Sequence, residues 1–248
     1  MAVRLRVQVI NIIGGRSMSA KIVFLEGPNY CGKSTIIKAL TEILSNEGKK
    51  VYGTCEPGGN LFEDGIRRLL LDKELNDKCE MDYTCRRFLY AAAHAQKLKE
   101  LKEKIPEYDY IIVDRYNPVS DLVYGMMSKS KEEKGPYKKY LISQNIFSSF
   151  DHSFLKDNAT LIFLEISLET LNDRIKARNT TENKIYDYED LDFKIGIRDN
   201  YYYLAHSLKN NRTNIYKDFV PFNDVHIVNA NRSANEVARD VIRLLASK

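Results

Sequence analysis

The chain has 248 residues, of which 44% are apolar and 29% are charged, and its formal net charge at pH 7 is +4. This length suits one domain with a sizeable core and is short for two. No stretch approaches the roughly 20 consecutive apolar residues of a membrane span, and so slight a positive charge does not indicate a nucleic-acid partner.

The first 17 residues contain no acidic residue and carry Arg4, Arg6 and Arg16. This composition is compatible with an N-terminal extension or with a mitochondrial targeting leader. Residues 3–10 alternate like a strand and not like a transit helix, which favours the extension. The four cysteines show neither metal-type spacing nor disulfide density, as is typical of a reducing compartment. We therefore expect a cytoplasmic protein with one domain at residues 18–248, and a mitochondrial location is the alternative.

Five short apolar runs predict buried strands, at residues 21–26, 50–53, 110–114, 160–166 and 225–229. Helical periodicity and stop signals predict helices at residues 33–46, 65–71, 83–104, 168–178, 191–209 and 234–246. Strands that alternate with helices predict an α/β fold, with a five-stranded parallel sheet flanked by helices on both faces. Residues 128–139 are rich in Lys, Glu, Gly and Pro and predict an exposed connection.

Between the first strand and the first helix, the spacing Gly-x-x-x-x-Gly-Lys-Ser occupies residues 27–34. A strand, this loop and a helix in that order are the context that a phosphate-binding P-loop needs. The glycines let backbone amides face a phosphate, and the positive end of the following helix adds to them. Lys33 is expected to contact the β and γ phosphates of ATP, and the Ser34 hydroxyl to bind Mg²⁺. The expected ATP-binding residues of this loop are Gly27, Pro28, Asn29, Tyr30, Cys31, Gly32, Lys33, Ser34 and Thr35.

Further segments resemble, in their order along the chain, motifs of the thymidylate kinase family of nucleoside monophosphate kinases. Glu56-Pro57-Gly58-Gly59 is similar to the family's Glu-Pro-Gly-Gly stretch, and Asp114-Arg115-Tyr116 to its Asp-Arg-Tyr signature. Residues 88–96 resemble the helix that holds the acceptor base, and residues 198–205 resemble the family's Arg-x-x-Tyr-x-x-Leu-Ala helix. The resemblance implies a P-loop NTPase fold with a short lid at about residues 174–190. It also implies phosphoryl transfer from ATP to a deoxynucleoside monophosphate, with dTMP as the first candidate and dTDP as the product.

The resemblance implies roles for single residues as well. Arg115 is expected to hold the α-phosphate of the acceptor, and Asp114 to hold Mg²⁺ together with Ser34. Arg174 and Arg178, at the start of the lid, are expected to close over the transferring group, and Arg178 to contact ATP. The implied catalytic residues are Lys33, Asp114, Arg115 and Arg174. The implied acceptor-binding residues are Glu56, Arg67, Tyr90, His94, Arg115 and Tyr124. The expected ligands are small-molecule nucleotides with Mg²⁺, and the expected assembly is a homodimer.

Several positions depart from the family pattern, mainly on the acceptor side. Asn29 replaces a common acid, Tyr30 replaces an arginine of one branch, and His94 replaces the base-reading arginine. A histidine donates one hydrogen bond but offers no planar fork. Cys55 stands where an arginine is often found, and Tyr124 lies one residue later than the family's aromatic residue. Three alternatives therefore stay open: a deoxynucleoside kinase, a kinase for a modified pyrimidine monophosphate, and a catalytically silent nucleotide-binding homologue.

Overall fold

The computed structural model describes residues 20–72, 74–75, 78, 81–127, 143–177, 190–210 and 220–246. Its centre is one sheet with the strand order β2-β3-β1-β4-β5. Neighbouring strands all run parallel, so the predicted five-stranded parallel sheet is confirmed. The strands are β1 (Lys21–Glu26), β2 (Val51–Cys55), β3 (Tyr110–Asp114), β4 (Ala159–Glu165) and β5 (Asp224–Asn229).

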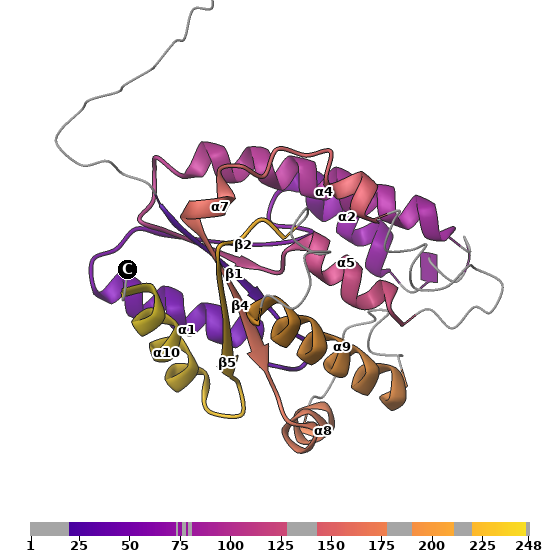
Figure 1. Cartoon of the computed structure of the whole chain (residues 1–248). Helices are drawn as coiled ribbons and strands as arrows, with labels where there is room; N and C mark the ends of the chain where they lie inside the picture. The colour runs from indigo at the N-terminus through magenta and orange to yellow at the C-terminus, as the bar shows by residue number, and fades with distance from the viewer. Residues whose placement is uncertain are drawn as a thin grey trace, which may run out of the picture.

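Helices cover both faces of the sheet (Figure 1). On one face α1 and α10 lie side by side, and on the other face α4, α5 and α9 share a core with the strands. Helix α2 packs against α4. The helices are α1 (Lys33–Asn46), α2 (Leu61–Leu71), α4 (Tyr83–Lys104), α5 (Asn117–Gly125), α7 (Leu155–Asn158), α8 (Leu168–Ala177), α9 (Leu191–Lys209) and α10 (Ala234–Ala246).

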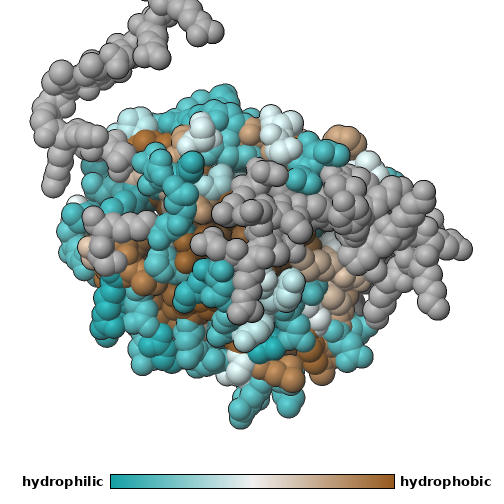
Figure 2. All heavy atoms as spheres, in the orientation of Figure 1, coloured by the Kyte–Doolittle hydropathy of each residue, from teal (hydrophilic) through white to brown (hydrophobic). Residues whose placement is uncertain are grey.

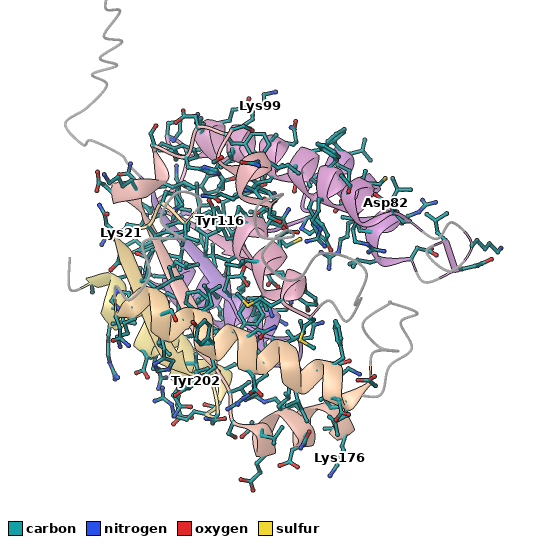
Figure 3. All side chains as sticks on the ribbon, turned by 45° about the vertical axis from the view of Figure 1, so that its right-hand side comes forward. Lys21, Asp82, Lys99, Tyr116, Lys176 and Tyr202 are labelled. Atoms are coloured by element: carbon teal, nitrogen blue, oxygen red, sulfur yellow. The ribbon has the colours of Figure 1, made fainter. Side chains whose placement is uncertain are left out.

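Alternating side chains of each strand build one apolar core on each face of the sheet. Ile22 and Phe24 enter the core beneath α4, α5 and α9, whereas Val23 and Leu25 enter the core beneath α1 and α10. This follows from the two-residue period of an extended strand, and burial on both faces explains the continuous apolar run. Figure 3 shows Tyr116 in the interior between the sheet and α4. The strand ends are therefore held between two packed layers.

Side-chain caps explain where two of the helices begin. The Asn60 side chain accepts a hydrogen bond from the Glu63 amide at 2.9 Å, so α2 begins at Leu61 and not at residue 65. Asp82, labelled in Figure 3, accepts from the Thr84 amide at 2.8 Å, and α4 begins at Tyr83 as predicted. Helices α5 and α7 were not predicted, because 9 and 4 residues show too few turns for a clear period.

Three sequence-based predictions fall wholly or partly on residues that the structure does not describe, namely the N-terminal extension, the exposed connection at residues 128–139 and the lid beyond residue 177. The cysteines that it does describe, Cys31, Cys55 and Cys85, are free thiols. Within the described part of the chain, no helix is both long and apolar enough to cross a membrane. Figure 2 shows a face that is mostly hydrophilic, with separate smaller hydrophobic areas.

The carboxyl ends of β1, β2 and β3 meet at one edge of the sheet. Leu25 of β1 and Cys55 of β2 are both paired with Asp114 of β3. The loops that follow these three strands are therefore neighbours, although they are far apart in the sequence. In an open parallel sheet this edge is where ligands bind.

Candidate active site

A cavity of about 860 Å³ lies at this edge of the sheet. Its volume is near the upper end of the range of roughly 300–1,000 Å³ that is usual for small-molecule sites. The lining comes from seven parts of the chain: residues 29–36, Glu56 and Pro57, Arg67 and Leu71 of α2, α4, Asp114 with Arg115 and α5, Arg174 of α8, and residues 232–234. One cavity therefore brings together most of the residues that the sequence singled out.

The cavity is strongly cationic. Seven lining residues are cations, Lys33, Arg67, Arg86, Arg87, Arg115, Arg174 and Arg232, and three are acids, Glu56, Asp114 and Asp121. The whole chain carries a net charge of only +4, so an excess of this size in one cavity is a local concentration of positive charge. Such a cavity attracts polyanions such as nucleotides.

The loop between β1 and α1 has the geometry of a phosphate cradle. Gly32 precedes α1 with a φ of 96°, a left-handed conformation that suits glycine. Among the described residues no side chain caps α1 and its first turn holds no acid, so no side chain of the helix itself offsets its positive end. Lys33 Nζ donates to the carbonyls of Gly27 and Pro28, each at 2.9 Å, and so lies across the loop. The predicted loop residues line the cavity, except Gly27 and Pro28.

Asp114 and Ser34 bring two side-chain oxygen atoms together beside this loop. The Ser34 hydroxyl donates to Asp114 Oδ2 at 3.2 Å, although the two residues come from different segments. The other carboxylate oxygen, Asp114 Oδ1, is buried and has no hydrogen-bond partner among the described residues. Mg²⁺ takes few protein ligands and prefers carboxylate and hydroxyl oxygens. These two residues fit that ion, and the described residues hold no cluster of three or more metal-binding side chains.

Arg115 lies on a buried acid, Glu26, that the sequence analysis had not singled out. The Glu26 carboxylate accepts from the Tyr116 amide at 2.7 Å, the Tyr201 hydroxyl at 2.8 Å and the Ser120 hydroxyl at 3.0 Å. Arg115 Nη1 lies 3.6 Å from it and donates to the Tyr201 hydroxyl at 2.7 Å. Burial raises the pKa of Glu26, and Arg115 acts against that shift. Glu26 directly precedes Gly27, so an acid that ends an apolar strand was the available sequence signal.

The charge on Arg115 is secured by its surroundings. Burial opposes this charge, yet the Tyr201 and Tyr124 phenols and the nearby carboxylates raise the pKa of Arg115 well above its usual value. Its backbone is also unusual, with a left-handed φ of 79°. For a residue other than glycine this conformation is strained and is found most often at functional sites. Arg115 is therefore a fixed cation at the cavity wall.

Asn29 links Arg115 to Tyr124. Its side-chain oxygen accepts from Arg115 Nη2 at 2.7 Å, and its side-chain nitrogen donates to the Tyr124 hydroxyl at 3.2 Å. The predicted residues Asn29, Arg115 and Tyr124 thus meet, although they lie on three different elements. An amide makes both contacts, whereas an acid could only accept.

His94 does not line the cavity, which corrects the expectation that it reads the base of a ligand. It is 1% exposed, and its Nδ1 lies 2.5 Å from Glu56 Oε1 while its Nε2 lies 2.8 Å from His152 Nε2. Burial, with the neighbouring His94, lowers the pKa of His152 to about 3. Glu56 lines the cavity, but its second oxygen accepts from the Asn117 amide at 2.9 Å. Both ring nitrogens of His94 are thus used inside the core.

Lys97 of α4 anchors the loop that follows β2. Lys97 Nζ is buried and donates to Thr54 Oγ1 at 2.7 Å and to the Gly58 carbonyl at 2.9 Å. On the cavity side, Arg67 Nη1 donates to the Pro57 carbonyl at 2.7 Å. Arg67 of α2 therefore reaches the cavity and contacts a loop that α4 anchors.

At the other end of the cavity, Arg174 contacts the phosphate loop. Its guanidinium donates to the Cys31 carbonyl at 2.7 Å and to the Ala230 carbonyl at 2.8 Å. Arg174 lies within α8, in the helix that the sequence predicts at residues 168–178, and residues 178–189 of the predicted lid lie outside the described residues. The other predicted lid arginine, Arg178, lies outside the described residues.

The remaining wall is formed by α4 and α5. Tyr90 lines the cavity, and Asn117 Nδ2 donates to the Tyr90 carbonyl at 3.2 Å. Asn117 Oδ1 is buried without a hydrogen-bond partner among the described residues, so it can accept from a ligand. The lining residues that the sequence analysis missed include Arg86, Arg87, Asn117, Asp121 and Arg232. They belong to no motif, and only the packing of α4 against α5 brings most of them to the cavity.

Comparisons with known proteins show to which family the chain is similar. The family model described as thymidylate kinase matches residues 25–241. A thymidylate kinase of Bacillus cytotoxicus is 30% identical over 232 residues, which are 93% of this chain and 99% of the relative. One of Pediococcus pentosaceus is 27% identical over 92% of this chain and 98% of the relative. One of Bacillus velezensis is 31% identical over 74% of this chain and 81% of the relative.

Proposed function

Because this chain belongs to the thymidylate kinase family, we propose that it transfers the γ-phosphoryl group of ATP to dTMP and forms dTDP. One observation carries this proposal beyond the family name. Arg115 Nη1 lies 3.4 Å from the Gly27 carbonyl, and Nη2 donates a hydrogen bond to Asn29 Oδ1 at 2.7 Å. Arg115 therefore contacts the P-loop, which is expected to bind the phosphates of the donor ATP. A cation at that point can hold an acceptor phosphate directly against the phosphates of a bound ATP.

Phosphoryl transfer asks a protein mainly for positioning and for neutralisation of charge. Lys33 and the amides of the loop hold the β and γ phosphates of ATP. Arg115 holds the acceptor phosphate, and its fixed orientation on Glu26 and Tyr201 keeps that phosphate in line with the donor. Ser34 and Asp114 would hold Mg²⁺, and the ion would neutralise charge on the phosphates.

The donor and acceptor bind at opposite ends of the cavity. Arg174, bonded to the Cys31 carbonyl, supports the donor end, and this contact favours a role in ATP binding. Glu56, Arg67, Tyr90 and Tyr124 line the acceptor end. Glu56 acts there by holding its loop, because His94 and Asn117 use both of its oxygens.

A panel of acceptors tests the proposed function. The full chain is incubated with Mg-ATP and, separately, with dTMP, dUMP, dCMP, dGMP, thymidine and modified pyrimidine monophosphates, and ADP release is measured. We expect dTMP to give the highest kcat/KM. Transfer to thymidine but to no monophosphate would identify a deoxynucleoside kinase instead, and no transfer to any acceptor would refute an enzymatic role.

The homodimer is also a proposal. Four large apolar side chains are exposed on α2 and α4, which pack against each other: Leu61, Phe62, Leu69 and Phe88. Exposed apolar clusters of this kind mark interaction surfaces. Gel filtration with light scattering should give twice the chain mass of 28.7 kDa. A Phe62→Ser, Phe88→Ser variant should give the mass of one chain, and a variant that stays dimeric would place the interface elsewhere.

A further inference from the structure

Arg87 of α4 and Asp121 of α5 form a buried ion pair in the wall of the acceptor end. Arg87 is 5% exposed and Asp121 is 4% exposed, yet both line the cavity. Asp121 Oδ2 accepts a further hydrogen bond from the buried Ser143 hydroxyl. Both oxygens of Asp121 thus have a partner, and both residues of the pair still border the cavity.

The position of Arg87 on α4 makes it a candidate for contact with the acceptor base. Arg87, Tyr90 and His94 are spaced by three and four residues, so they lie on one face of the helix. The guanidinium carbon of Arg87 lies 5.4 Å from the centre of the Tyr90 ring. His94 is turned into the core, whereas Arg87, on the same face, reaches the cavity wall beside the aromatic residue.

The pair differs in kind from the cations that face the phosphates. Asp121 offsets the charge of Arg87, so the two together offer a neutral partner with one donor side and one acceptor side. A phosphate would gain little from such a pair, because the carboxylate repels it. A neutral group that carries an N–H beside a carbonyl is its complement. The imide edge of a pyrimidine base has this arrangement.

We propose, on the basis of the proposed function, that the Arg87–Asp121 pair reads the base of the acceptor nucleotide. Asp121 accepts the imide N3–H of thymine, and Arg87 donates to the adjacent ring carbonyl. Cytosine has no hydrogen on N3, so the carboxylate would face a lone pair. Uracil presents the same imide edge, so the pair separates dTMP from dCMP but not from dUMP.

The test combines a modified substrate with variants of the pair. Kinetics of the full chain are measured with dTMP, dCMP and N3-methyl-dTMP, whose methyl group replaces the imide hydrogen. With the wild-type chain we expect kcat/KM for N3-methyl-dTMP to be lower than for dTMP by about 100-fold, since a site built to bond an N–H discriminates strongly against its loss. In an Arg87→Met, Asp121→Leu variant this ratio should fall below about 5-fold, with the KM for ATP unchanged within about 2-fold. The exposed Lys102 on the same helix supplies a control, because Lys102→Met should alter none of these constants.

A second, conservative variant tests the proposal even if the double variant does not fold. Arg87→Lys keeps the charge opposite Asp121 but loses the planar fork, so the KM for dTMP should rise about 10-fold while the KM for ATP does not change. An unchanged KM for dTMP in Arg87→Lys would overturn the assignment. So would a double variant in which kcat/KM for N3-methyl-dTMP is still about 100-fold lower than for dTMP. Equal use of dTMP and N3-methyl-dTMP by the wild-type chain would overturn it while leaving the kinase function intact. No transfer to any monophosphate would instead refute both.

Discussion

Replacing Glu26 with glutamine removes the negative charge that pairs with Arg115, while the size of the side chain is kept. The carboxylate accepts from the Tyr116 amide at 2.7 Å through Oε1 and from the Gly27 amide at 3.3 Å through Oε2. A glutamine has only one oxygen, so one of these two backbone donors must face an NH₂ group. The Tyr201 hydroxyl can rotate to adapt, but a backbone amide cannot.

The size of the effect follows from three contributions. A buried donor without an acceptor costs about 1–3 kcal/mol, and a hydrogen bond to a charged group contributes about 1.5–3 kcal/mol. Burial raises the pKa of Glu26, which means that its charged form is costly in the core, and glutamine recovers part of that cost. We therefore expect Glu26→Gln to lower the free energy of unfolding by about 2 kcal/mol. The KM for dTMP should rise about 10-fold, because Arg115 loses its orientation.

Urea unfolding and steady-state kinetics measure the two effects separately. Glu165→Gln is the matched control, since Glu165 ends the neighbouring strand β4 and is partly exposed, with a hydrogen bond to His206. This control should change the unfolding free energy by less than about 1 kcal/mol and leave the KM values for dTMP and for ATP unchanged. If Glu26→Gln destabilises the protein but leaves the KM for dTMP unchanged, Glu26 does not position Arg115.

Lys33→Ala should lower kcat by about 100-fold or more, because the lysine neutralises charge on the phosphates. The control is Lys38→Ala on the exposed side of α1, which should leave kcat unchanged. A coupled ADP-release assay measures both variants. The pKa of His152 is about 3 in the folded chain, below its usual 6.5, so the unfolded chain binds more protons between these values and stability falls as the pH is lowered through this window. Between pH 6.5 and pH 5, urea unfolding should show that the free energy of unfolding of His152→Phe falls by about 2 kcal/mol less than that of the wild type. An equal fall in both proteins would contradict the predicted pH dependence. Lys97→Met should cost about 3–5 kcal/mol because it leaves buried carboxylates unpaired, while Lys99→Met, which removes an outward-pointing side chain (Figure 3), should cost less than about 1 kcal/mol in the same experiment.

Most of the sheet could be predicted from local patterns. The strands at residues 21–26 and 110–114 and the helices at residues 33–46, 83–104, 191–209 and 234–246 have the predicted bounds. Their apolar runs and periods are properties of the chain itself, and so are the caps. Short elements such as α7, with 4 residues, leave no period to read, and their position depends on packing.

The donor side of the site could also be predicted from the sequence, because the P-loop is a local structure and the spacing of its residues determines its conformation. The acceptor side was not. His94 occupied the position of a base-reading residue, but its side chain turned inward because Glu56 and His152 offer both of its nitrogens a partner in the core. Arg87 and Asp121 were overlooked, since they are 34 residues apart in the sequence and meet only where α4 packs against α5.

The sequence by itself determined the class of fold, the order of the strands and of the longer helices, and the presence of a loop that can hold a triphosphate. These depend on contacts between residues close together in the chain. The tertiary structure alone decided which charges are buried together: Glu26 beneath Arg115, Lys97 beneath the Glu56 loop, and Asp121 beside Arg87. A buried charge needs a partner, and that partner is set by how distant elements pack. The choice of acceptor therefore rests on packing, whereas the binding of the donor rests on local sequence.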